Sequence, residues 1–157
     1  MALSLLGVVL VTAVIFFLWP RDQQPAGEVV AGTFDEVQSR QVVYLAGPGV
    51  FVVAAETGFV ALSDDARHVG DRVLYCAQDN TFSAPHGERF DRLGRYMAGP
   101  AAGDLGRYPV KVEDNRVLVD VSGELELPDR SPSSDAPAGP RCEGAEDPPG
   151  FFQGGAP

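Results

Sequence analysis

Cysteine and histidine are scarce in this sequence. Among its 157 residues there are two of each. The cysteines, Cys76 and Cys142, are too few for a disulfide scaffold or for a cage of metal-binding thiolates. They allow one bridge if the domain lies outside the cytoplasm. The alternative is that Cys76 is simply a small apolar residue in the core, as is more common for a cysteine in a strand.

Positive charge is scarce as well. Twelve Lys and Arg residues stand against 22 Asp and Glu, which gives a formal net charge of −10. This charge repels the phosphate backbone of nucleic acids and excludes a function in binding them. An acidic surface suits a basic partner such as a small electron carrier, or it serves solubility alone.

Patterns of catalytic residues are missing too. Ser83 and His86 are close in sequence, but a nucleophilic serine also needs an orienting acid and an oxyanion hole. The glycines do not form a phosphate loop ahead of a helix. We therefore predict no catalytic activity of its own for this chain.

One long apolar run is present, at the N-terminus. Ala2–Trp19 carry no charge, and as a helix they would span roughly 27 Å, close to the thickness of the hydrocarbon core of a bilayer. A cleaved signal peptide is the competing interpretation, but the basic start and the small residues at a cleavage site are missing. We predict a transmembrane anchor over residues 1–20 and a polar linker over 21–27.

The next section, residues 28–122, contains short runs of β-branched and aromatic residues separated by Gly, Pro, Asp and Asn. This pattern predicts one all-β domain, a sandwich or small barrel. Turn residues predict hairpins at 45–50 and at 113–116. Residues 123–157 are rich in Pro, Gly, Ser and acidic residues, and we predict a disordered C-terminal tail there.

The most informative residues lie between Ala61 and Leu105. A first loop reads Ala66-Arg67-His68-Val69-Gly70-Asp71, a second reads Ser83-Ala84-Pro85-His86-Gly87-Glu88, and Phe90-Asp91, Gly94 and Gly99-Pro100-Ala101 follow. This ordered set resembles the Rieske [2Fe-2S] family, whose two loops read C-x-H-x-G-C and C-x-C-H-G. The resemblance implies a Rieske-like antiparallel β-sandwich for the body of the chain.

Every cysteine of that pattern is replaced here. The resemblance implies that the cluster ligands stood at the positions of Ala66, His68, Ser83 and His86, and a disulfide between the loops at those of Asp71 and Pro85. In a Rieske centre two histidines bind one iron and two thiolates bind the other. Ala66 has no donor atom, and the hydroxyl of Ser83 is a poor substitute for a thiolate. We expect no cofactor, and a [2Fe-2S] cluster only as the alternative.

The two histidines, His68 and His86, are retained, and the family frame would bring their rings together. With a carboxylate from Asp65 or Asp71 they would resemble a mononuclear metal site. The other interpretation is that they are relics that hydrogen-bond to backbone or water. We favour the second, because two histidines alone make a weak site.

These expectations lead to a membrane-anchored, Rieske-like subunit that has lost its cluster. It would serve as a structural or docking component of a membrane respiratory or redox complex, with the two loops and the turn at 99–101 as contact surface. The alternative is an electron-transfer protein, part of an oxidoreductase complex, with an atypical metal site. The small subunit of assimilatory nitrite reductase is a precedent for the fold without a cluster, although that family is cytoplasmic and has no anchor.

The sequence gives two conflicting indications of the side of the membrane on which the domain lies. Arg21 alone, beside Asp22, would place the domain in the cytoplasm. The resemblance implies the opposite, because anchored relatives hold this domain outside. We follow the resemblance and expect a single-pass protein with an extracytoplasmic domain, in which Cys76 and Cys142 could form a bridge.

Overall fold

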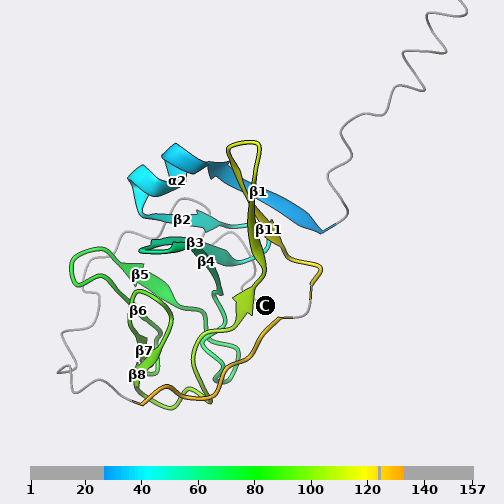
Figure 1. The fold of residues 1–157 in the computed structure, drawn as a ribbon. Helices are drawn as coiled ribbons and strands as arrows, with labels where there is room; N and C mark the ends of the chain where they lie inside the picture. Colours follow the sequence, from blue (N-terminus) through cyan, green and yellow to red (C-terminus); the bar gives the residue numbers. More distant parts are fainter. Residues whose placement is uncertain (1–26, 124, 133–157) are drawn as a thin grey trace, which may run out of the picture.

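The computed structural model describes residues 27–123 and 125–132. This part of the chain is almost entirely β-structure (Figure 1). In chain order the elements are β1 (Glu28–Thr33), α2 (Phe34–Arg40), β2 (Val42–Leu45), β3 (Val50–Ala55), β4 (Gly58–Ser63), β5 (Leu74–Cys76), β6 (Thr81–Ser83), β7 (Arg89–Phe90), β8 (Tyr96–Ala98), β9 (Arg107–Tyr108), β10 (Val110–Glu113) and β11 (Arg116–Asp120). The predicted all-β class is confirmed.

The strands form three antiparallel sheets. Their orders are β1-β11-β10, β2-β3-β4-β9 and β5-β6-β7-β8. The sheet of β5 to β8 lies apart from α2 and β1, at the lower left of Figure 1. It is inserted in the chain between β4 and β9, so the connections into and out of it lie near one another.

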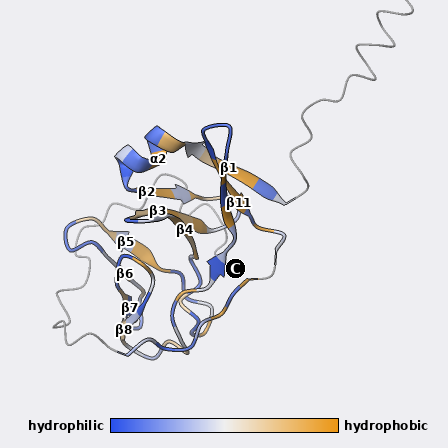
Figure 2. Cartoon of the chain, in the orientation of Figure 1, coloured by the Kyte–Doolittle hydropathy of each residue, from blue (hydrophilic) through white to orange (hydrophobic). Residues whose placement is uncertain are grey.

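Strand β3 links two hydrophobic cores. Its residues Phe51 and Val53 belong to the core shared with the β5–β8 sheet, whereas Val50 and Val52 belong to the core shared with β11 and α2. Successive side chains of a strand point to opposite faces, so β3 is buried on both sides. This explains its unbroken apolar sequence, which appears as orange ribbon in Figure 2.

Both predicted hairpins are present. β2 pairs with β3, with Leu45 opposite Val50, and β10 pairs with β11, with Glu113 opposite Arg116. Gly49 and the central residues of the second turn, Asp114 and Asn115, have positive φ values. Glycine, aspartate and asparagine tolerate that conformation best, which is why these sequences turn.

A helix that the strand pattern did not predict, α2, follows β1 directly. Thr33 caps it, since its Oγ1 accepts a hydrogen bond from the backbone N–H of Glu36 at 3.2 Å. Val37 is its buried residue, in the core with β3 and β11. Threonine followed three residues later by glutamate is a helix-start signal, but the helix is too short to show helical periodicity.

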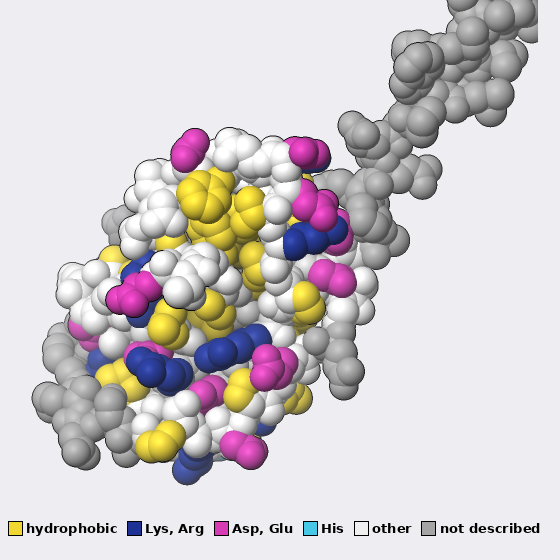
Figure 3. Space-filling model, viewed as in Figure 1, with side chains coloured by type: hydrophobic (Ala, Val, Ile, Leu, Met, Phe, Trp, Pro, Cys, Tyr) yellow, Lys and Arg dark blue, Asp and Glu magenta, His cyan; other side chains and the backbone are white. Residues whose placement is uncertain are grey.

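Hydrophobic side chains also reach the surface beside this helix. Phe34 is partly exposed and packs edge-on against Phe59 of β4, with ring centroids 5.3 Å apart. Figure 3 shows such side chains gathered in the upper part of the face that it draws. The acidic and basic side chains lie scattered around them.

The structure tests the predicted tail in part, but it does not describe the predicted anchor. The predicted anchor, residues 1–20, lies outside the described residues, and within the described ranges no helix is long and apolar enough to cross a membrane. The predicted disorder of the tail is wrong for residues 125–132. Glu126 pairs with Arg107 of β9, and Ser131 binds Asp104, because the backbone and polar groups of this segment find partners on the domain. The remainder of the predicted tail lies outside the described residues.

Candidate functional site

Two loops bring the retained histidines together. The first, residues 66–71, is closed by the backbone hydrogen bond from Ala66 N–H to Asp71 O at 2.8 Å. The second is closed by the bond from Ala84 N–H to Glu88 O at 3.0 Å. The ring centroids of His68 and His86 lie 5.7 Å apart, with the rings nearly perpendicular. The predicted convergence of the two histidines is therefore present.

A third residue, Glu88, completes the group, and the sequence analysis did not single it out. One ligand atom from each of His68, His86 and Glu88 lies within 4.8 Å of the other two. The side chain of Glu88 is fully buried, and neither carboxylate oxygen has a hydrogen-bond partner among the described residues. Nε2 of His68 lies 3.9 Å from Oε1 of Glu88, beyond hydrogen-bond distance.

An unpaired buried carboxylate is costly to the fold. A charged group that loses water without gaining a partner destabilises the protein, and a positive ion beside it removes most of that penalty. The buried carboxylate of Glu88 would therefore be stabilised by a positive ion bound next to it.

Asp71, considered above as a metal ligand, instead hydrogen-bonds to one of the histidines. Its Oδ2 makes a short hydrogen bond to Nδ1 of His86. This hydrogen bond, and the negative charge of Asp71, raise the pKa of the His86 imidazole. This contact joins the first loop to the second.

Asp65, the other carboxylate considered as a ligand, is not part of the group. It is exposed, and its Oδ1 accepts a hydrogen bond from the backbone N–H of Arg67 at 2.7 Å. Pro85 is exposed beside His86. Glu88 is only two residues from His86, but no local pattern marked its side chain as buried.

Two glycines shape the second loop. Gly87 has a positive φ of 93°, and Gly99, also at 93°, lies against the loop from the far side. A Cβ on Gly99 would lie 2.6 Å from Cα of Glu88 and from O of Gly87. The Gly99-Pro100-Ala101 turn is thus a close packing partner of the loop that carries Glu88, with Ala101 buried beneath it.

The exposed tip of the first loop is apolar. The side chain of Val69 is 76% exposed, and its φ is +43°, as is rare for a β-branched residue. Arg67 is also in the left-handed region, and its side chain anchors the loop by donating to the carbonyl of Asp104 at 3.0 Å and to that of Pro128. Such conformations persist only where the surroundings enforce them.

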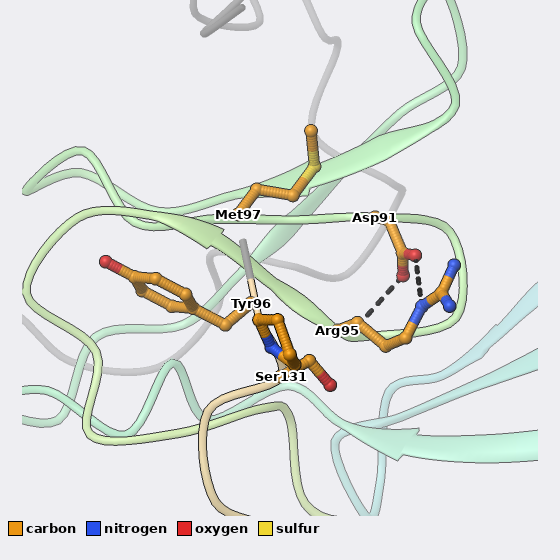
Figure 4. A pocket seen from close by; sticks show the side chains of 6 residues that line it. Asp91, Arg95, Tyr96, Met97 and Ser131 are labelled. Carbon is orange, nitrogen blue, oxygen red and sulfur yellow. Dashed lines mark hydrogen bonds and ion pairs between the residues drawn. The ribbon is translucent and has the colours of Figure 1, made fainter. Parts of the chain in front are cut away.

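A cavity of about 200 Å³ lies elsewhere, between β8 and the C-terminal segment (Figure 4). Its lining residues are Asp91, Arg95, Tyr96, Met97, Ser131 and Pro132. The side chains of Asp91 and Arg95 are paired at 2.6 Å. None of these residues belongs to the histidine loops, so the cavity is separate from the candidate site.

Comparison with solved structures identifies the architecture. The cyanobacterial plasma membrane Rieske protein PetC3 of Synechocystis PCC 6803 is similar to this chain, with a TM-score of 0.50 and 27% sequence identity. The match covers 58% of this chain and 97% of that protein. The chain contains a Rieske-like domain.

A second solved structure is also similar to this chain. The ferredoxin of carbazole 1,9a-dioxygenase from Nocardioides aromaticivorans IC177 matches with a TM-score of 0.43 and 25% identity, over 59% of this chain and 95% of its own. No family model matches the chain. A search of curated proteins gives no match either.

The residues of this Rieske-like domain do not fit a [2Fe-2S] cluster. Ala66 is fully buried and has no donor atom. The Oγ of Ser83 lies 3.4 Å from Sγ of Cys76, so this hydroxyl is hydrogen-bonded to the neighbouring strand β5. The two irons of a Rieske cluster require two thiolates as well as two histidines. Of the ligands that such a cluster requires, these loops supply the two histidines and neither thiolate.

Cys76 is not a free thiol. It lies buried in β5, and its sulfur is part of a disulfide. The other cysteine of the sequence, Cys142, lies outside the described residues. That the partner of Cys76 in this disulfide is Cys142 therefore stays a prediction.

Proposed function

We propose that this protein is a docking subunit of a membrane redox complex whose Rieske-like domain holds no [2Fe-2S] cluster of its own. The observation that carries the proposal is the donor set. At the position of one iron ligand stands the buried side chain of Ala66, and the hydroxyl of Ser83 is hydrogen-bonded to the sulfur of Cys76. Binding, rather than electron transfer through a cluster, is the function that these loops support.

The surface available for docking is the tip of the two loops. Val69 is exposed and apolar in the first loop, and Pro85 and His86 are exposed in the second loop. A large apolar side chain held out into solvent by a strained backbone favours a role in contact with a partner. The partner proposed is another subunit of the complex, with a basic electron carrier as a further candidate for the acidic surface.

The membrane setting rests on two supports. The apolar run Ala2–Trp19 has the length of a transmembrane helix. The similar Synechocystis protein is described as a plasma membrane protein. We propose a single-pass protein with its Rieske-like domain on the extracytoplasmic side.

Cluster content is tested on the full chain, purified without a tag in detergent. We expect a folded, colourless protein without acid-labile sulfide. A cysteine-complete Rieske protein, produced and purified in the same way, is the control for cluster assembly in the host. If this chain contained about two iron and two sulfide atoms, as a [2Fe-2S] centre does, the proposal would be wrong and the electron-transfer alternative would stand.

Docking is tested by crosslinking in native membranes, followed by purification of the full chain and identification of the crosslinked subunits. Val69→Glu should reduce recovery of the partner subunits at least tenfold. Val112→Glu is the matched control, because Val112 is also exposed, at 47%, but lies on β10 away from the loops. Equal recovery with both variants, or recovery of no redox-complex subunit with the wild type, would contradict the proposal.

A further inference from the structure

We propose that His68, His86 and Glu88 bind one divalent transition-metal ion of the Zn²⁺ type. This inference goes beyond the docking function and does not depend on it. It replaces the cluster expected of the family with a mononuclear site of different composition. Its third ligand, Glu88, has no counterpart among the Rieske cluster ligands.

The first argument is the composition of the group. Two imidazoles and one carboxylate, with positions left open for water, are a common ligand set for Zn²⁺ and Fe²⁺. Mg²⁺ and Ca²⁺ prefer oxygen ligands throughout and do not suit two histidines. The chemistry of the group therefore selects a borderline transition metal over the hard cations.

The second argument is the buried carboxylate. Glu88 is fully buried, both of its oxygens lack hydrogen-bond partners in the described part of the chain, and one of them lies 3.9 Å from Nε2 of His68. A metal ion would supply the missing partner for these oxygens. Burial also holds the carboxylate in place, so one of the three ligands is fixed before the ion arrives.

The third argument is the support behind His86. Its Nδ1 is hydrogen-bonded to Asp71, which leaves Nε2 as the nitrogen available to a metal. A carboxylate behind a histidine in this manner orients the ring and raises its strength as a ligand. The residue at the former disulfide position thus acts as a positioning residue for the new site.

The spacing of the ligand atoms is compatible with binding after a small adjustment. Metal–nitrogen and metal–oxygen bonds of about 2.0–2.2 Å hold ligand atoms about 3–3.5 Å apart. The present separations of up to 4.8 Å require movements on the order of 1 Å. The side chain of His86 is 58% exposed, so there is room around it for its ring and the paired Asp71 to make such a movement.

Binding is measured by equilibrium dialysis and by visible absorption of Co²⁺, a coloured substitute for Zn²⁺. The untagged full chain is first stripped with a chelator. We expect one Zn²⁺ or Co²⁺ ion per chain and a Co²⁺ absorption band, with no binding of Mg²⁺ or Ca²⁺ at the same concentrations. His86→Ala and Glu88→Gln should each weaken binding at least tenfold, and Asp71→Asn by about 10–100-fold.

Glu56→Gln is the matched control for Glu88→Gln, since it removes the same charge from an exposed residue in the turn between β3 and β4. Zn²⁺ should raise the melting temperature of the wild type and of Glu56→Gln, but not that of Glu88→Gln. His86→Ala changes an exposed loop residue and keeps the test valid if Glu88→Gln proves unstable. Absence of saturable Zn²⁺ binding, or equal affinity in Glu88→Gln and Glu56→Gln, would overturn the proposal.

Discussion

Gly99 lies directly against the backbone of Glu88. A Cβ placed on Gly99 would be 2.6 Å from Cα of Glu88 and 2.7 Å from its nitrogen, and φ of Gly99 is +93°. Both the close approach and the backbone conformation exclude other residues there. The turn after β8 therefore supports the second histidine loop from behind, and the position of the buried carboxylate depends on it.

Gly99→Ala should lower the free energy of unfolding by about 2 kcal/mol or more, since it adds a clash to an unfavourable φ. Urea denaturation of the full chain measures the loss. Gly47→Ala is the control: its Cβ would meet nothing within 4 Å, and Gly47 is not among the positive-φ glycines. If the two variants were equally stable, the close packing of Gly99 would not matter to the fold.

Glu88→Gln should raise the stability of the chelator-treated protein at neutral pH by about 1–3 kcal/mol, because it removes a buried carboxylate that has no hydrogen-bond partner among the described residues. Thermal and urea unfolding test this, with Glu56→Gln as the control. In saturating Zn²⁺ the order should reverse. A Glu88→Gln protein that is less stable in both conditions would show that the carboxylate stabilises the fold by itself.

Stability should decrease in acid partly through Asp104. Burial raises the pKa of this carboxyl, but hydrogen bonds from the side chain and backbone of Ser131 and from Tyr96 N–H outweigh it, so the pKa is lowered. A lowered pKa stabilises the fold above the unfolded value, and this contribution is lost as the pH falls below about 4. Unfolding at pH 7 and pH 3 should therefore show a smaller difference for Asp104→Asn than for the wild type. Asp114→Asn, in the exposed β10–β11 turn, should behave like the wild type.

The segment 125–132 should loosen when Arg130 is replaced. The guanidinium of Arg130 donates to the carbonyl of Ala101 and lies 4.5 Å from the ring centre of Tyr96. Arg130→Ala should increase hydrogen exchange in this segment about tenfold, which corresponds to about 1.4 kcal/mol, within the range for a charged hydrogen bond plus a cation–π contact. Arg40→Ala, which removes an exposed ion pair with Glu36, should leave the exchange unchanged. Unchanged exchange in Arg130→Ala would mean that the hydrogen bonds of Ser131 hold the segment alone.

Much of the fold followed from local sequence. The apolar run of β3, the turn residues at Gly49, and Asp114-Asn115 each specify a strand or a turn through steric preference and burial within a few residues. The loss of thiolate ligands was equally local, because Ala66 carries no donor atom whatever its surroundings. The helix α2 was signalled by Thr33 and Glu36 but was too short for its periodicity to show.

The composition of the candidate site was decided by tertiary structure. The sequence placed two histidines in matching loops, and we considered Asp65 or Asp71 as the carboxylate beside them, but not Glu88. Pairing of β7 with β6 and β8, and the approach of Gly99, bury Glu88, whereas Asp71 reaches His86 across the loops. Which carboxylate is buried depends on its packing partners in the folded domain, and the residues next to it in the sequence do not reveal those partners. For the same reason only the structure shows that Ser131 and Arg130 hold residues 125–132 against the domain.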